Sequence, residues 1–368
     1  MKFIPVAGAT VPLLVVAFVA AALLALLITP VIRAVVRRRG MFDAPNHRRV
    51  NTKPVPRGGG LAVVVAFVAV GGGLTIFRSS FETMPAPVGL TAGELGAVFG
   101  GGALAALMGA VDDLLDLRAR WQLLFQLALA GFAVALGVGV DHISNPLGAG
   151  QIPFATPFAI AFTVVWIVGM LNSLNFIDGL DGLSTGIALI AALTLGVLSL
   201  TTDIGQPYVA VLCVVLAGAL LGFLRFNFQP ASIFQGTAGV MFIGYVLALL
   251  AILGTAKVVV AVLVLGVPII DTFWVIVRRL LAGRSPFTPD RGHIHRRLLD
   301  VGLGHRGTVL LIYAICASLG VMSLVVSTAT QVYAFLGALV VFGLVLFLLT
   351  RASNDALAAD AYGPDGPE

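Results

Sequence analysis

The sequence predicts an all-α integral membrane protein that crosses the bilayer many times, and two observations lead to this prediction. Apolar residues make up 59% of the 368 residues, whereas charged residues make up only 11%. A soluble domain of this length would contain roughly a quarter charged residues. In addition, apolar runs of about 17–25 residues recur along the whole chain, and each is long enough to span the hydrocarbon core as a helix.

Eleven apolar runs fit such helices. The first is too long for the core of a signal peptide, so we expect it to remain as an anchor. We expect residues 1–351 to form one transmembrane domain and residues 352–368, which combine acidic residues with Gly and Pro, to form a disordered cytoplasmic tail. The expected helices cover residues 10–36, 58–77, 93–111, 122–140, 154–171, 184–200, 207–224, 238–254, 258–277, 308–327 and 330–350.

The basic residues predict the orientation of these helices. Of 22 Lys and Arg residues, all but Lys2, Arg78 and Lys257 fall at or beside the loops after the odd-numbered helices. Because cytoplasmic loops are rich in Lys and Arg, we expect the N-terminus outside and the C-terminus in the cytoplasm. The net charge of +5 is then a topology signal, and we expect no nucleic-acid partner. On the outer side, the turn-rich stretch “DHISNPLGAGQIPF” favours a short hairpin.

Acidic side chains gather in the same cytoplasmic loops. The stretch “GAVDDLLDL” places Asp112 and Asp113 at the exit of the third helix, and “NSLNFIDGLDGL” places Asp178 and Asp181 between the fifth and sixth. Acids at membrane depth are costly and tend to mark function, and neighbouring carboxylates raise one another's pKa unless a cation offsets them. Because Mg²⁺ prefers oxygen ligands and bridges substrate phosphates, we predict a metal-dependent site for a phosphate-bearing substrate.

A basic loop after the ninth helix supplies candidate ligands for such phosphates. Its sequence, “RRLLAGRSPFTPDRGHIHRRLLD”, contains Arg279, His293 and His295. Arginine binds phosphate through paired hydrogen bonds. One acidic pair at a helix end is more often a solvated cap, and two histidines in a basic loop are slightly more often incidental. Several such loops on one face of a chain with only 17 acidic residues favour a functional site.

These motifs resemble those of the polyprenyl-phosphate N-acetylhexosamine-1-phosphate transferases, which are membrane enzymes of cell-envelope glycan synthesis. The likeness runs from about residue 33 to residue 313. It rests on “VDDLLDLRARWQLLFQ”, “NSLNFIDGLDGL”, “RFNFQPASIFQGTAG” and “PIIDTFWVIVRRLLAGRSPFTPDRGHIHRRL”. The stretch “HIHRRLLDVGLGHR” is similar to the branch that uses UDP-N-acetylglucosamine or a related UDP-sugar.

The resemblance implies a reaction at the inner face of the bacterial plasma membrane. An N-acetylhexosamine-1-phosphate, with N-acetylglucosamine as the favoured sugar, would pass from a UDP-sugar to undecaprenyl or another polyprenyl phosphate, and UMP would be released. This would be the first lipid-linked step of an envelope glycan. The resemblance also implies Mg²⁺ as the cofactor, with Mn²⁺ as the alternative ion, and leaves a homodimer as one option for assembly.

The resemblance further implies roles for individual residues. Asp112 or Asp113 would deprotonate or orient the lipid phosphate, and Asp178 and Asp181 would complete the catalytic acids on the donor side. Asn175 and Asp178 would hold the metal. The expected substrate-binding residues are Asn172, Asn175, Arg279, His293 and His295.

Several positions depart from the family pattern. The family usually reads “GDAGS” where this chain reads “GTAGV”, so Thr237 replaces an acidic metal ligand and Val240 replaces a serine. Asn51 and Arg296 stand in place of histidines, and Gln122 stands in place of a lysine. A threonine hydroxyl offers a lone pair but not the charge that Mg²⁺ prefers.

These departures leave two further hypotheses beside an active transferase. One is a degenerate family member that binds a UDP-sugar or polyprenyl phosphate without turnover. The other is a secondary transporter. Transporter sites lie near the bilayer midplane and are often related by repeat symmetry, whereas the acids here lie at one edge of the membrane, so the transporter hypothesis ranks last.

Overall fold

The computed structural model describes residues 10–43, 54–80, 84–145, 150–201, 205–254, 258–281, 283, 285 and 292–325, with a few residues between 333 and 345. It confirms the predicted all-α membrane class. In this part of the chain, six helices are long and apolar enough to cross a membrane, and shorter apolar helices cover Leu61–Ile76, Ala119–Ala135 and Leu183–Ser199.

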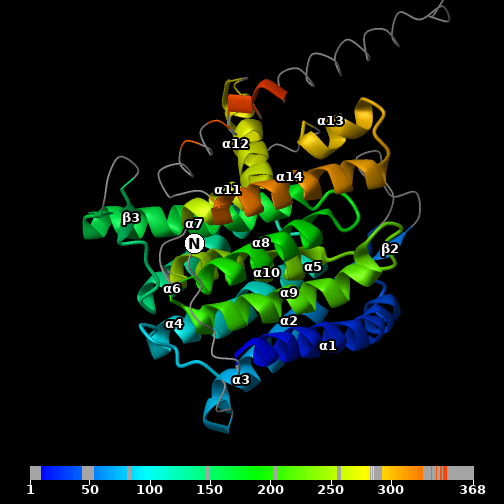
Figure 1. Cartoon of the computed structure of the whole chain (residues 1–368). Helices are drawn as coiled ribbons and strands as arrows, with labels where there is room; N and C mark the ends of the chain where they lie inside the picture. Colours follow the sequence, from blue (N-terminus) through cyan, green and yellow to red (C-terminus); the bar gives the residue numbers. More distant parts are fainter. Residues whose placement is uncertain are drawn as a thin grey trace, which may run out of the picture.

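The helices follow one another with short connections (Figure 1). Their bounds are α1 (Thr10–Arg38), α2 (Leu61–Phe67), α3 (Gly73–Ile76), α4 (Ala92–Gly96), α5 (Gly102–Leu115), α6 (Ala119–Ala135), α7 (Thr156–Ile177), α8 (Leu183–Ser199), α9 (Pro207–Asn227), α10 (Gly236–Leu253), α11 (Val258–Val264), α12 (Gly266–Leu281), α13 (Ile294–Asp300) and α14 (His305–Val325). Short π-helical segments join α2 to α3 and α4 to α5.

Two small antiparallel hairpins accompany the helices. Strands β1 (Phe42–Asp43) and β2 (Val55–Pro56) pair with each other before α2. Strands β3 (His142–Ser144) and β4 (Gln151–Pro153) pair between α6 and α7, which confirms the hairpin predicted in that loop.

Each of the ten helices expected before residue 328 overlaps a helix of the structure, but the ninth is interrupted. The expected helix over 258–277 is in fact α11 and α12, which meet at Leu265. Pro268 explains the interruption, because proline has no N–H to donate and its ring clashes with the carbonyl four residues earlier. Figure 1 shows α12 standing across the direction of α8, α9 and α14. The expected helix over 330–350 lies largely, and the tail over 352–368 wholly, outside the described residues.

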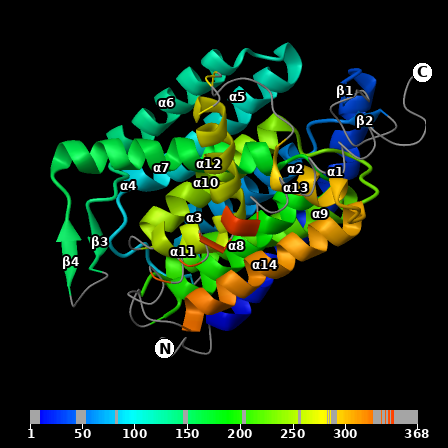
Figure 2. The same ribbon diagram turned by 90° about the horizontal axis from the view of Figure 1, so that it is seen from above.

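Helix α10 forms the centre of the bundle. Every residue from Gly236 to Leu253 is buried, and Figure 2 shows α10 in the middle with α6 and α14 on opposite edges. Small residues let neighbouring backbones approach closely, as is common in membrane helices. A Cβ on Gly109 of α5, for example, would lie 2.5 Å from the Cα of Ala238 in α10. The first turn of α10 is therefore enclosed by other segments.

Several helix ends meet around that first turn. The Asp113 carboxylate at the end of α5 accepts a hydrogen bond from the Thr237 N–H of α10 at 2.8 Å. Asp178, directly after α7, contacts Ser184 of α8, and His305 at the start of α14 contacts the backbone of Asp181. The structure thus gathers at one end of the bundle the motifs that the sequence placed in loops on one side.

Candidate active site

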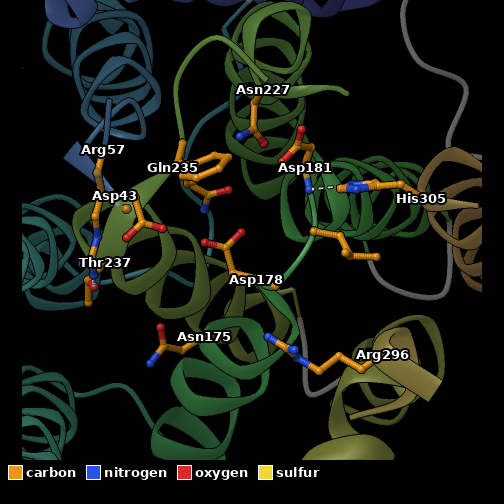
Figure 3. Close-up of a pocket in the computed structure, with 14 residues that line it drawn as sticks. Asp43, Arg57, Asn175, Asp178, Asp181, Asn227, Gln235, Thr237, Arg296 and His305 are labelled. Carbon is orange, nitrogen blue, oxygen red and sulfur yellow. Dashed lines mark hydrogen bonds between the residues drawn. The ribbon is translucent and has the colours of Figure 1, made fainter. Parts of the chain in front are cut away.

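A polar cavity of about 230 Å³ opens beside the first turn of α10. In Figure 3, Asp178 lies near its centre, Arg57 and Thr237 lie on one wall, and Asp181 and His305 lie on another. The cavity is lined by Asp43, Arg57, Asn175, Asp178, Gly179, Leu180, Asp181, Asn227, Phe234, Gln235, Gly236, Thr237, Arg296 and His305. Acidic, amide and basic side chains from distant parts of the sequence therefore face one space.

Asp178 is the acid most directly placed in this cavity. Helix α7 extends six residues beyond the expected end at 171, so Asn172 and Asn175 are helical and Asp178 follows the last turn. The Ser184 hydroxyl lies 2.5 Å from Asp178 Oδ1. Burial raises the pKa of Asp178 to about 6, although the Ser184 hydrogen bond and the Arg57 charge oppose that shift. A cation in the cavity would stabilise the ionised carboxylate.

Asp181 is held in place from two directions. Its Oδ2 accepts a hydrogen bond from the Ala231 N–H at 2.9 Å, and its own N–H donates to Nε2 of His305 at 3.0 Å. His305 therefore accepts at Nε2, which assigns its ring proton to Nδ1 when the ring is neutral. Gly182 follows with a φ of +78°, a conformation that favours glycine, and so the chain turns sharply into α8.

Asp113 faces the start of α10 instead of lining the cavity. Its Oδ1 accepts from the Thr237 N–H at 2.8 Å, and its Oδ2 accepts from the Ala238 N–H at 3.1 Å. Nε of Arg57 also lies 2.7 Å from Oδ1. An acid at a helix N-terminus satisfies N–H groups that have no partner within the helix and complements the positive end of the dipole. Asp113 therefore links the cavity wall to the central helix.

Asp112 lies in a separate, largely apolar pocket of about 20 Å³ between α5, α6 and α10. Its Oδ1 accepts hydrogen bonds from the Gln122 side chain at 2.7 Å and from the Leu117 N–H at 3.1 Å. Thr237 lines both this pocket and the polar cavity, so the two spaces adjoin. Asn172 lies outside the cavity, where its amide N–H donates to Oε1 of Gln126 at 2.7 Å.

The two predicted histidines pack behind one another against the 178–182 loop. His295 contacts Gly179 of the loop, and His293 stacks on His295. Nδ1 of His293 lies 2.7 Å from Oδ2 of Asp271, and its ring stacks at 9° on the ring of His295. His295 packs directly on Gly179, where an added Cβ would lie 2.3 Å from Nε2. Burial lowers the pKa of His295 well below its usual value, and nearby basic groups lower it further, so the ring is neutral at pH 7. Neither histidine, nor the buried Arg279, lines the cavity.

The comparisons with known proteins agree with these motifs. Residues 95–255 match glycosyl transferase family 4. A Bacillus subtilis protein, the probable undecaprenyl-phosphate N-acetylglucosaminyl 1-phosphate transferase, is 34% identical over 95% of this chain and 94% of its own length. The Mycobacterium tuberculosis decaprenyl-phosphate N-acetylglucosaminephosphotransferase is 35% identical over 97% of this chain and 94% of its own length.

A more distant relative, the Escherichia coli undecaprenyl-phosphate alpha-N-acetylglucosaminyl 1-phosphate transferase, is 25% identical over 79% of this chain and 78% of its own length. The chain belongs to the polyprenyl-phosphate N-acetylhexosamine-1-phosphate transferase family. Its many apolar helices and these relatives identify a multi-pass bacterial membrane protein.

The positions that depart from the family pattern have defined places in this family member. Thr237 accepts a hydrogen bond from Nη2 of Arg57 at 2.7 Å, and Val240 is buried within α10. The Gln122 side chain donates a hydrogen bond to the Asp112 carboxylate, and Arg296 lines the cavity. Asn51 lies outside the described residues.

Sequence reasoning did not single out several residues of this site. Arg57 was expected only as one of many cytoplasmic basic residues, yet it precedes “GGG”, where close backbone approach was a usable signal. Asp271 is a lone acid in an apolar helix, which is costly enough to suggest a role. Asn227, Gln235 and His305 lie in stretches that carry the family resemblance, but no residue-level pattern singles them out, because only the fold brings them beside Asp178.

Proposed function

We propose that this chain transfers N-acetylglucosamine-1-phosphate from UDP-N-acetylglucosamine to a polyprenyl phosphate. An oxygen of the lipid phosphate would attack the sugar-linked phosphorus of the donor, the bond from that phosphorus to the bridging oxygen would break, and UMP would leave. The observation that carries the proposal is a cavity that combines Asp178 and Arg57 where membrane helices end, in a chain closely related to transferases named for this reaction. Phosphoryl transfer depends mainly on positioning and charge neutralisation.

Asn175 and Asp178 fit a Mg²⁺ ion, with Mn²⁺ as the alternative. Both line the cavity, where an amide oxygen and a carboxylate would supply the oxygen ligands that Mg²⁺ prefers. In the described part of the chain, no three His, Cys, Asp or Glu residues form a metal cluster. Mg²⁺ needs only one or two carboxylates when phosphates and water complete its shell. Such an ion would neutralise charge on the donor diphosphate.

The lipid phosphate would approach beside the pocket that holds Asp112, which at about 20 Å³ has room for little more than one water molecule. That pocket is lined by apolar residues of α5, α6 and α10 and adjoins the cavity at Thr237. Asp112 would orient the acceptor phosphate there. Basic residues end α1, α9 and α12, and Arg118 immediately precedes α6. A cytoplasmic location for these ends, as the positive-inside rule predicts, would expose the site to the nucleotide donor.

The test is release of UMP by the purified full chain in detergent. UDP-N-acetylglucosamine and undecaprenyl phosphate would be supplied with Mg²⁺, with Mn²⁺ or with EDTA. We expect metal-dependent UMP release. Asp178→Asn should lower its rate roughly 10²–10³-fold, whereas Asp300→Asn, a matched change at the exposed end of α13, should leave it intact. Binding of the UDP-sugar without turnover under every condition would contradict the proposal and would support the non-catalytic alternative. The relatives' names give that alternative no support.

A further inference from the structure

Arg57 has a backbone fixed against the segment that leads into α10. It pairs as an isolated parallel bridge with Phe234. The Gly59 N–H donates to the Phe234 carbonyl at 2.8 Å, and the Gly60 N–H donates to the Gln235 carbonyl at 2.8 Å. A Cβ on Gly60 would lie 2.3 Å from the Cα of Gly239, so this approach requires glycine. The base of the Arg57 side chain therefore has one defined position.

The guanidinium group of Arg57 is fixed as well. Its Nε contacts Asp113 at 2.7 Å, and its Nη2 donates to the Thr237 hydroxyl at 2.7 Å. Asp113 is only 1% exposed, and two N–H groups of α10 hold it in turn. An arginine held on one edge in this way loses little further entropy when a ligand binds its other edge.

The rest of the guanidinium faces the polar cavity. Arginine carries five N–H donors, and the two contacts above use Nε and one N–H of Nη2. The side chain is 26% exposed and lines the same cavity as Asn175 and Asp178 (Figure 3). The N–H donors of Arg57 that these two contacts do not use therefore indicate that an anion binds next to Asp178.

We propose that Arg57 binds a substrate phosphate, and that Asp113 and Thr237 position it for this. The proposal rests on the function proposed above and adds a residue and a contact to it. Two phosphate sources share this chemistry, namely the diphosphate of the nucleotide donor and the phosphate of the lipid acceptor. Thr237 suits the role because it is neutral. An acid at that position would compete with the substrate for the guanidinium.

The test compares variants of the full chain in detergent without divalent metal. Calorimetry would measure the Kd for UDP, for uridine and for a short polyprenyl phosphate, and thermal unfolding would report folding. We expect Arg57→Gln to weaken binding of UDP or of the lipid phosphate by at least tenfold while uridine binding stays unchanged. The affected ligand identifies the phosphate source. Arg57→Lys should restore part of the affinity, because it returns the charge but not the paired hydrogen bonds.

Two variants of Thr237, with Arg225→Gln as a control, keep the test decisive if Arg57→Gln does not fold. Thr237→Val removes one anchor of the guanidinium but leaves its pair with Asp113, and should weaken phosphate binding severalfold, whereas Thr237→Ser should match the wild type. Arg225→Gln is the control. It removes the same charge from an arginine that lines a separate apolar groove between α1 and α9, and it should bind UDP normally.

The outcomes separate this inference from the proposed function. Wild-type chain that neither binds UDP nor releases UMP from the donor would overturn the proposed function. Wild-type chain that does both, while folded Arg57→Gln binds UDP and the lipid phosphate with unchanged Kd, would overturn the role of Arg57 alone. If Arg57→Gln does not fold, an unchanged Kd of folded Thr237→Val for both ligands would overturn it.

Discussion

Two acidic pairs end two helices of this protein, and the fold uses them differently. Asp112 and Asp113 end α5, where their carboxylates accept hydrogen bonds from protein groups on neighbouring segments. Asp178 and Asp181 follow α7, and both line the polar cavity. The two pairs look alike as sequence, with acids at the end of an apolar run. The comparison of Asp113 with Asp178 teaches that a carboxylate at a helix end can fix a neighbouring helix or face a reaction site. The donors that the rest of the fold supplies decide between the two, since Asp113 meets two N–H groups and Arg57, and Asp178 meets one hydroxyl.

The largest expected effect separates the pairs by stability. Asp113→Ala would leave Arg57 without its ion-pair partner and would remove the acceptor from the first turn of α10. Breaking a buried ion pair by removing one partner costs about 3–5 kcal/mol, and because Arg57 is 26% exposed we expect a loss towards the lower end of that range. Asp178→Ala should cost far less, because it removes an acid that burial disfavours. Thermal or denaturant unfolding in detergent measures both. Equal stability of the two variants would remove the distinction between the pairs.

The second effect separates the pairs by activity. We expect Asp178→Asn to lower the rate of UMP release roughly 10²–10³-fold, the usual cost of removing a group that stabilises charge in the transition state. Because Asn keeps the size of the side chain, its unfolding temperature should stay close to that of the wild type. Turnover of Asp178→Asn at the wild-type rate would show that the cavity is not where the phosphates react.

A smaller effect tests how the loop between Asp178 and Asp181 is supported. Gly179→Ala would push a Cβ into the His295 ring, whereas Gly169→Ala in α7 is a matched control with open space around it. A shift of the loop by about 1 Å can lower activity as much as a hundredfold, so we expect a loss between tenfold and a hundredfold for Gly179→Ala alone. Steady-state kinetics would show it. If both variants match the wild type, the stacked histidines do not position the loop.

The smallest effect is a pH dependence of stability without metal. The pKa of Asp178 is raised from 3.8 to about 6 in the folded chain, so between these values the folded state binds more protons than the unfolded state. Stability from this group therefore rises as the pH falls from about 7 towards 4. The unfolding temperature of the wild type relative to Asp178→Asn should increase by a few degrees between pH 7.5 and pH 5 in EDTA. A constant difference would contradict the raised pKa.

Much of the fold follows from the sequence, because apolar runs long enough to span a bilayer have few alternatives to a helix. The hairpin between α6 and α7 and the grouping of the polar motifs at one end of the bundle are confirmed, whereas the side of the membrane on which each lies stays a prediction. The interruption between α11 and α12 was missed, although Pro268 lies at that point in the sequence. Apolarity alone does not report a bend, so the run over 258–277 predicts a single span.

The arrangement of the site was harder to predict, for a physical reason. Asp113 is satisfied by N–H groups 124 and 125 residues away, and Arg57 meets Thr237 across 180 residues. Which carboxylate oxygen faces a cavity and which faces a helix end depends on such distant partners. The residue types at Asp178 and Asn175 indicate metal and phosphate chemistry, but only the packing of α5 against α10 turns Asp113 away from the cavity.

The most direct test of the central claim is an experimental structure of the chain with UDP-N-acetylglucosamine and Mg²⁺ bound. We predict that the diphosphate lies in the cavity beside α10, with one phosphate against Arg57 and the ion next to Asp178 and Asn175. A diphosphate bound outside that cavity, with Asp178 and Arg57 both remote from its oxygens, would contradict the account.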